Sequence, residues 1–254
     1  MNEHTIFNGL IIGWFVLAAV VFIALLFFVA PYGRHVRKGW GPTLSNRVGW
    51  IVMEAGAPVI LAVCFVLKGN IISVTSVAFL VLWETHYVYR SFVYPFTLRG
   101  VTAKRMPISI AGMGVLFNGV NGYLNGRYIF NLSGGYAESW LRDPRFIIGV
   151  IIFILGYLLN RRADHILRSL RKPGETGYKV TDKWPYQWIS CPNYLGEILQ
   201  WVGWAIATWS LAGLAFVVWT AANLIPRARA NHLWYRRTFP DYPPERKALI
   251  PHVW

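Results

Sequence analysis

Long apolar stretches separated by short polar segments run through the whole chain. The first covers residues 7–31 without a charged residue, and others lie at about 48–67, 71–97, 107–126, 146–160, 194–209 and 211–234. A helix rises about 1.5 Å per residue, so about twenty apolar residues cross a hydrocarbon core of about 30 Å. We divide the last two stretches at 210–213 because together they are too long for one ordinary span. The pattern predicts an all-α integral membrane protein with seven transmembrane helices, in a single domain over residues 1–254.

The basic residues fall mainly on one side of these predicted spans. Twenty Lys and Arg lie in the segments 33–49, 98–106, 161–190 and the tail from Arg227, and four lie on the other side. Cytoplasmic loops of membrane proteins carry such an excess. We therefore expect the N-terminus outside the membrane or in the lumen and the C-terminus in the cytoplasm. The first apolar run is too long for a signal-peptide core, so we expect it to be retained.

Composition supports the membrane class and argues against several others. Hydrophobic residues make up 55% of the chain and charged residues only 14%. The net charge of +14 comes mostly from the short predicted cytoplasmic segments, so we expect no nucleic-acid partner. The two cysteines, Cys64 and Cys191, lie in an apolar run and a polar segment. They form neither a disulfide framework nor a metal-ligand spacing, so no metal site is predicted.

An acidic residue lies inside the second predicted span. Glu54 is flanked by apolar residues on both sides. Burying an ionised carboxylate in hydrocarbon costs about 2.5–3.5 kcal/mol. The carboxylate could lie near the interface and pair with a structural cation. It could instead be a functional acid that faces a cavity, the usual interpretation of an ionisable group within a membrane.

Polar and aromatic residues share one face of the third predicted span. Tyr87, Arg90 with Ser91, and Tyr94 have the i, i+3/i+4, i+7 spacing of a helical face. Such a face contacts protein or water rather than lipid. An interfacial aromatic belt explains Tyr94 but not the whole run. A tyrosine near a buried carboxyl can donate a hydrogen bond to a carbonyl oxygen and stabilise an enolate that forms there.

A second polar face follows the fifth predicted span. Asn160, Asp164, Arg168 and Arg171 have helical spacing. Arginine binds phosphate through paired hydrogen bonds, and amides and carboxylates can bind ribose hydroxyls or an adenine edge. A lipid-headgroup patch has the same spacing. The sequence has no glycine-rich phosphate-binding motif, so a nucleotide site here would be unconventional.

These segments together resemble the membrane steroid 5α-reductase family, the 3-oxo-5α-steroid 4-dehydrogenases, and especially its type 2 members. The resemblance covers nearly the whole chain. Its most specific parts are Leu-Arg-Ser-Leu-Arg-Lys-Pro-Gly-Glu at 167–175 and Arg-Lys-Ala-Leu-Ile-Pro at 246–251. Further matching segments lie at 32–33, 54, 86–94, 152–156, 193–197, 207–211 and 241–243.

The resemblance implies NADPH-dependent reduction of the C4–C5 double bond of a 3-oxo-Δ4-steroid, such as a testosterone- or progesterone-like substrate. It implies hydride transfer to C5, and a seven-helix protein in a lipid bilayer. The membrane would be the bacterial inner membrane or, in a eukaryote, that of the endoplasmic reticulum. We expect a monomer.

The resemblance also assigns residues. The catalytic pair would be Glu54 and Tyr87, which would hydrogen-bond the 3-oxo group. Cytoplasmic segments at about 160–190 and 227–254 would bind NADPH. The implied cofactor-binding residues are Tyr32, Asn160, Asp164, Arg168, Arg171, Tyr178, Asn193, Glu197, Arg227, His232 and Tyr235. The implied substrate-binding residues are Trp50, Met53, Arg90 and Phe117. Met53 departs from the family pattern, in which animal members have a glutamine.

Three other functions share part of this pattern. Enoyl-CoA-type reductases form a related branch of the same superfamily. Pro192-Asn193-Tyr194-Leu195-Gly196-Glu197 also resembles an element of isoprenylcysteine and phospholipid methyltransferases, which bind S-adenosylmethionine. A non-catalytic sterol or lipid transporter would not need the polar face that begins at Asn160.

Overall fold

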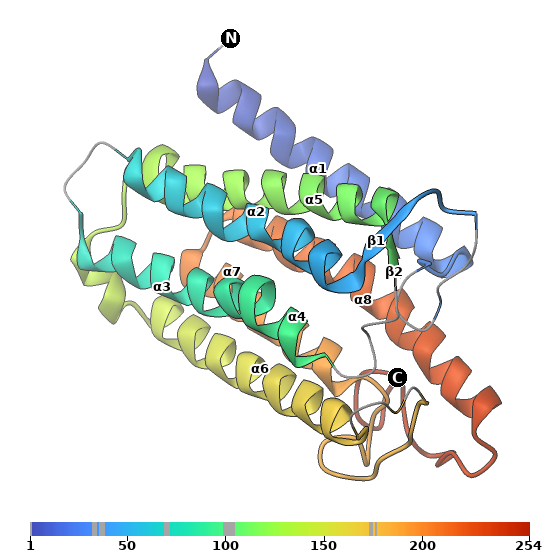
Figure 1. The fold of residues 1–254 in the computed structure, drawn as a ribbon. Coiled ribbons are helices and arrows are strands. Elements are labelled where there is room, and N and C mark those ends of the chain that lie inside the picture. The colour runs from blue at the N-terminus through green and yellow to red at the C-terminus, as the bar shows by residue number, and fades with distance from the viewer. Residues whose placement is uncertain are drawn as a thin grey trace. The chain divides into compact units, whose positions relative to one another are not determined.

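Helices make up most of the chain in the computed structural model, which describes residues 2–31, 35, 39–68, 72–98, 105–172, 175 and 177–254. Figure 1 shows α1 (Glu3–Phe27), α2 (Asn46–Val66), α3 (Val74–Val88), α4 (Tyr94–Thr97), α5 (Ile108–Arg127), α6 (Pro144–Ser169), α7 (Pro192–Thr208) and α8 (Leu211–Thr238). The π-helices are η2 (Tyr89–Val93) and η3 (Tyr128–Leu132), and η4 (Glu138–Arg142) is a 3₁₀-helix. A helix therefore lies at each apolar stretch, and the prediction of a helical protein is confirmed.

Four helices of the described chain, α1, α2, α6 and α8, are long and apolar enough to cross a membrane. The count of seven crossings and their direction remain predictions. The expected break near residue 210 is present, because α7 ends at Thr208 and α8 begins at Leu211. Trp209 lies between them with φ of 45°, in the left-handed conformation that often ends a helix.

The chain divides into two compact units. Unit 1 consists of Met1–Ile11, Pro31–Ile147 and Ser210–Ala212, and unit 2 consists of Ile12–Ala30, Ile148–Trp209 and Gly213–Trp254. The expectation of a single domain over 1–254 stays a prediction, and Tyr32 lies outside the described residues.

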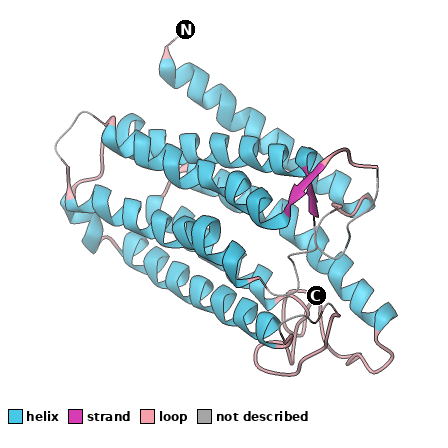
Figure 2. Cartoon of the chain, viewed as in Figure 1, coloured by secondary structure: helices cyan, strands magenta, loops and turns pink. Residues whose placement is uncertain are grey.

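In unit 1, α2 and α5 lie side by side along their length (Figure 1). Glycines on α5 make this approach close. A Cβ added at Gly122 would lie 3.0 Å from the Ala57 carbonyl oxygen, and one at Gly126 would lie 2.9 Å from Cys64 Cβ. Two short strands, absent from our prediction, also join unit 1. Figure 2 shows β1 (Thr43–Ser45) and β2 (Arg105–Pro107), which pair antiparallel beside these helices.

In unit 2, α6 and α7 approach each other so closely that their backbones touch. Gly149 and Gly156 of α6 face α7, and Gly196 and Gly203 of α7 face α6. A Cβ added at any of these four positions would overlap backbone atoms of the facing helix. The seven-residue spacing on each helix keeps the glycines on one face. Small residues permit this packing, which is common between membrane helices.

Candidate functional site

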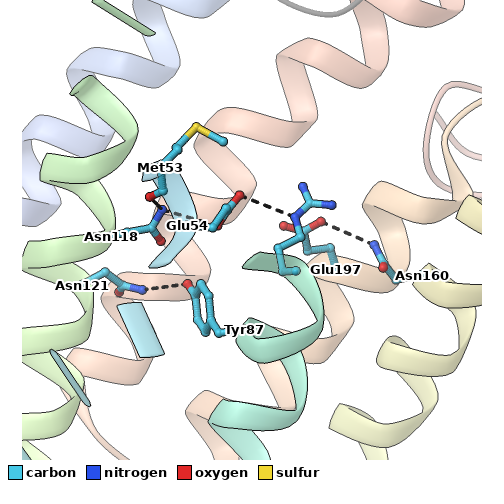
Figure 3. Close-up of polar contacts among 8 residues, drawn as sticks. Met53, Glu54, Tyr87, Asn118, Asn121, Asn160 and Glu197 are labelled. Carbon is cyan, nitrogen blue, oxygen red and sulfur yellow. Dashed lines mark hydrogen bonds and ion pairs between the residues drawn. The ribbon is translucent and has the colours of Figure 1, made fainter. Parts of the chain in front are cut away.

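The predicted acid, Glu54, lies in α2 and is only 9% exposed. Its Oε2 accepts a hydrogen bond from Asn118 Nδ2 of α5 at 3.4 Å, as Figure 3 shows. Pro58 lies four residues further along α2 and has no N–H to donate to the Glu54 carbonyl. The buried carboxyl is therefore held by a neighbouring helix, at a turn where α2 lacks one backbone hydrogen bond.

Arg90 is the charged neighbour of this carboxyl. Its Nε lies 3.5 Å from Glu54 Oε1, and its guanidinium carbon lies 4.4 Å from the Trp50 ring centroid and 4.7 Å from that of Tyr94. The predicted substrate-binding residues Trp50 and Arg90 thus contact each other, and Arg90 contacts the predicted catalytic acid.

The backbone at Arg90 differs from the regular α-helix that we expected through the third span, at about 71–97. It forms the π-helix η2, in which the Tyr94 N–H donates to the Tyr89 carbonyl oxygen. Pro95 follows directly. A proline in a regular α-helix would clash with the carbonyl four residues before it, here that of Ser91, and the wider turn of η2 precedes this point. Single π-helical turns occur frequently at functional sites.

Tyr87, the predicted partner of Glu54, lies in α3 and is 2% exposed. Its ring packs on Trp83 with centroids 4.8 Å apart and meets the His86 ring edge-on at 5.0 Å. Asn121 Nδ2 of α5 donates to the Tyr87 hydroxyl at 3.5 Å (Figure 3). One face of α5 therefore contacts both predicted catalytic side chains.

The other predicted substrate-binding residues lie along α2 and α5. Met53 precedes Glu54, packs against Gly114, and accepts a hydrogen bond from Asn118 Nδ2 at its backbone oxygen, 2.8 Å away. Phe117 is half-buried and precedes Asn118 in sequence. All four predicted substrate-binding residues thus belong to unit 1, and Trp50, Met53 and Arg90 lie near Glu54.

Unit 2 brings together four of the predicted cofactor-binding residues. Asn160 Nδ2 of α6 donates to Glu197 Oε2 at 3.4 Å (Figure 3). It also donates to the Asn193 backbone oxygen at 2.9 Å. Asn193 Nδ2 donates to Asp164 Oδ1 at 3.1 Å. Asn160 and Asp164 are 6% and 7% exposed. This cluster, Asn160–Asp164–Asn193–Glu197, offers two amides and two carboxylates within one small region.

Three arginines and Tyr178 also belong to the predicted cofactor set in unit 2. Arg227 Nε donates to the Tyr194 hydroxyl at 2.8 Å. Arg168 lies in the last turn of α6. Arg171 lies over the Tyr178 ring at 5.7 Å, and Tyr178 packs edge-on against Trp234.

Two further predicted residues, Tyr235 and His232, are joined to the C-terminal tail. Tyr235 stacks on Tyr242 with an interplanar angle of 9° and centroids 5.3 Å apart. His232 Nδ1 lies 2.7 Å from Ser190 Oγ, which also lies 2.7 Å from the Tyr242 hydroxyl. The tail therefore orders the side chains at the end of α8.

A small cavity of about 10 Å³ lies beside Ser190, Tyr235 and Tyr242. Its lining consists of Leu167, Lys179, Val180, Thr181, Tyr186, Ser190, Tyr235, Tyr242 and Arg246. It is close to the lower limit for one water molecule, so it is not a nucleotide site by itself. Burial raises the pKa of the phenols of Tyr186 and Tyr242 above their usual value. Both phenols are therefore neutral at physiological pH.

Sequence reasoning missed the polar residues that hold the predicted ones. Asn118, Asn121 and Asn125 lie in the fourth apolar stretch at i, i+3 and i+7, which places them on one helical face. This is the same signal that identified Tyr87 and Arg90. Ser190 and Tyr242 had no comparable periodic signal, because they lie outside the helices. Among the described residues, no group of three or more His, Cys, Asp or Glu side chains could hold a metal ion.

Comparison with known proteins gives a consistent result. A family model described as 3-oxo-5-alpha-steroid 4-dehydrogenase matches residues 104–254. Steroid 5-alpha-reductase DET2 of Gossypium hirsutum is 40% identical, over 100% of this chain and 99% of that protein. The 3-oxo-5-alpha-steroid 4-dehydrogenase 1 of Bos taurus is 38% identical over 93% of each chain. The human protein of the same name is also 38% identical, over 87% of this chain and 85% of its own length.

Proposed function

The chain belongs to the steroid 5-alpha-reductase family of oxidoreductases, and we propose that it reduces the C4–C5 double bond of a 3-oxo-Δ4-steroid with NADPH. The observation that carries the proposal is the pair of buried acidic side chains in unit 1. Glu54 and Tyr87 come from different helices, and each accepts a hydrogen bond from the same face of α5. A carboxyl and a phenol can both donate to one carbonyl oxygen.

The two side chains would act on the 3-oxo group of the substrate. The Glu54 carboxyl, in its protonated form, and the Tyr87 hydroxyl would each donate a hydrogen bond to the ketone oxygen. Polarisation of the ketone draws electrons from the conjugated double bond, so C5 becomes electrophilic. As negative charge develops on the oxygen, the same hydrogen bonds strengthen and stabilise the enolate. Reduction is complete when C4 takes up a proton from water and the enolate returns to the ketone.

Trp50, Met53, Arg90 and Phe117 would shape the substrate site. Arg90 is held over Trp50 and beside Glu54, so it would fix the orientation of the carboxyl. Met53 leaves no side-chain amide beside the ketone. We expect the specificity for the steroid to depend on apolar contact at this position.

The side chains of unit 2 have the chemistry that a dinucleotide requires. The carboxylates of Asp164 and Glu197 can accept hydrogen bonds from ribose hydroxyls, and the amides of Asn160 and Asn193 can bind an adenine edge or a carboxamide. Arg168, Arg171 and Arg227 can bind phosphate. The aromatic rings of Tyr178 and Tyr235 offer flat apolar surfaces. When bound, NADPH would supply the hydride that adds to C5.

We also propose seven membrane crossings, with the N-terminus outside and the C-terminus in the cytoplasm. Two contacts within unit 1 support this topology. Glu3 forms an ion pair with Arg127 at 2.5 Å, and both residues are expected outside. The strands β1 and β2 pair with each other, and both belong to segments expected in the cytoplasm.

The direct test of the function uses purified protein in detergent with NADPH and either testosterone or progesterone. We expect a steroid-dependent loss of absorbance at 340 nm and a 5α-reduced product. Absence of NADPH oxidation with every 3-oxo-Δ4-steroid, together with methyl transfer from S-adenosylmethionine, would contradict the proposal. If the protein reduced only an enoyl-CoA, the reductase activity would stand, but the substrate would be that of the enoyl-CoA branch of the superfamily.

A further inference from the structure

We propose that three asparagines of α5 position the two catalytic side chains, and that Asn121, held by Asn125, directs the Tyr87 proton toward the substrate ketone. This inference rests on the function proposed above. Asn118, Asn121 and Asn125 are 4%, 1% and 0% exposed. Buried amides on a membrane helix are costly unless they are hydrogen-bonded, so their contacts define what they do.

The orientation of the Asn121 amide follows from its neighbours. Asn125 Nδ2 lies 3.1 Å from the Asn121 backbone oxygen, which can only accept a hydrogen bond. The group of Asn125 at this point is therefore its NH₂. The same NH₂ lies 3.2 Å from the terminal atom of Asn121, which must then be the oxygen, Oδ1. The NH₂ of Asn121 is consequently the end that faces the Tyr87 hydroxyl.

This orientation fixes the polarity of the contact with Tyr87. The phenol oxygen accepts from Asn121, so the phenol O–H is directed to a different partner. A ketone oxygen is such a partner, and a phenol that accepts one hydrogen bond donates a stronger second one. The contact is long, at 3.5 Å, as catalytic hydrogen bonds often are before substrate binds.

Asn118 binds the second catalytic group, the Glu54 carboxyl, and the orientation of its amide follows in the same way. Its Nδ2 lies 2.8 Å from the Met53 backbone oxygen, which again identifies the NH₂ end, and 3.4 Å from Glu54 Oε2. The carboxyl therefore accepts at Oε2 from Asn118 while its Oε1 lies beside Arg90. The asparagine face of α5 thus sets the direction of both groups.

The test compares Asn121→Leu, which keeps the branched shape and the number of side-chain heavy atoms but has no polar group, with the wild-type protein. We expect kcat for steroid reduction to fall roughly 10- to 100-fold, the range for loss of positioning at a reacting group, while KM for NADPH stays unchanged. Equilibrium affinity for a 3-oxo steroid should fall roughly five- to tenfold, as for one lost hydrogen bond. Affinity for the same steroid without the 3-oxo group should not change.

Two additional variants separate positioning from a general effect on the fold. In a Tyr87→Phe background, Asn121→Leu should cause no further loss of affinity for the 3-oxo steroid, because it acts through the phenol. Asn125→Leu leaves the contact with Tyr87 in place but frees the Asn121 amide to rotate, so it should cause a smaller loss of the same kind. Asn131→Leu, on η3 and outside the site, is the matched control.

The outcomes are distinct. If wild-type protein reduces the steroid and Asn121→Leu keeps near-normal kcat, the positioning role is wrong. The positioning role is also wrong if the steroid with the 3-oxo group and the steroid without it lose affinity equally. If Asn121→Leu cannot be purified folded, the Asn125→Leu result decides in the same way. If wild-type protein reduces no 3-oxo-Δ4-steroid, the proposed function fails instead.

Discussion

The backbone of Asn160 lies directly against Gly196 and occupies the space that a side chain at position 196 would need. A Cβ at Gly196 would come within 2.5 Å of the Asn160 amide nitrogen. This approach lets the Asn160 side chain reach both the Asn193 backbone oxygen and the Glu197 carboxylate. The geometry of the predicted cofactor residues in unit 2 therefore depends on a residue that bears no side chain.

Gly196→Ala should destabilise the protein and weaken cofactor binding together. The added methyl group must push α6 and α7 apart, a change that typically costs about 1–3 kcal/mol. Thermal unfolding in detergent and KM for NADPH measure the two effects. The control is Gly112→Ala on α5, where an added Cβ meets no atom within 4 Å. Equal stability of the two variants would show that the close approach is not required.

Glu54→Leu should strongly lower the rate of steroid reduction, and Tyr87→Phe should do the same. Each variant loses one hydrogen-bond donor to the ketone oxygen, and loss of one donor to an oxyanion typically lowers kcat about 100- to 1,000-fold. NADPH should still raise the thermal stability of both variants. Glu84→Leu is the matched control, since Glu84 is an acid of α3 to which we assign no role in the reaction. A near-normal kcat for Glu54→Leu or Tyr87→Phe would disprove the assignment of that residue.

Asp164→Ala and Arg171→Ala should chiefly raise KM for NADPH and leave kcat nearly unchanged. Each removes a charged hydrogen-bonding group, which is worth about 1.5–3 kcal/mol, or roughly a 10- to 150-fold change in affinity. Steady-state kinetics at saturating steroid measure the effect, with Arg142→Ala in η4 as a control. An unchanged KM for the cofactor would instead favour a lipid-headgroup patch at the end of α6 and in the residues that follow it.

The apolar pattern was sufficient to place the helices, because each apolar stretch is long and is bounded by polar segments. The same pattern indicated Glu54 and Tyr87 as candidate functional residues, because polar groups within a membrane segment are costly and usually functional. The polar residues Asn160, Asp164 and Arg168 also follow from helical spacing alone, and the structure places Asn160 and Asp164 in one cluster. The prediction that Arg171 continues this helical face is wrong, because α6 ends at Ser169.

Side-chain contacts between segments distant in sequence could not be predicted in this way. The hydrogen bond from Asn121 to Tyr87 depends on how α5 packs on its neighbours, and helical spacing carries no information about that packing. The π-turn at Arg90 comes shortly before Pro95, and helical spacing does not predict such a turn. The contact between Ser190 and Tyr242 joins two irregular segments, for which no periodic signal exists.

Stability should fall at alkaline pH because of Tyr242. Burial raises the pKa of this phenol above its ordinary value of 10.0, so the folded state keeps the proton while the unfolded chain loses it. The contribution of the Tyr242 phenol to the free energy of unfolding is complete below pH 10 and is lost as pH rises through the folded-state pKa. Tyr242→Phe should cost about 0.5–1.5 kcal/mol at pH 7, as for one hydrogen bond. The difference from wild type, measured by chemical denaturation, should shrink above pH 10. A constant difference up to pH 11 would mean that the phenol titrates normally.

Cysteine labelling should place the segments before α7 and after α8 on the same side of the membrane. The Ser190 amide donates to the Lys247 backbone oxygen at 2.8 Å, and the Cys191 amide donates to that of Ala248 at 3.1 Å. Segments that pair in this way cannot lie on opposite faces of a bilayer, so α7 and α8 must return the chain to the side from which it came.

The reporters for this experiment are Lys183→Cys, Glu245→Cys and Glu138→Cys, all at exposed positions. The native Cys64 and Cys191 are buried and should give little background. In sealed cells or vesicles with the native orientation, a membrane-impermeant maleimide should label Glu138→Cys. It should reach Lys183→Cys and Glu245→Cys only after permeabilisation. Labelling of Lys183→Cys and Glu245→Cys from opposite sides would exclude a hairpin of α7 and α8, and with it the seven-span topology.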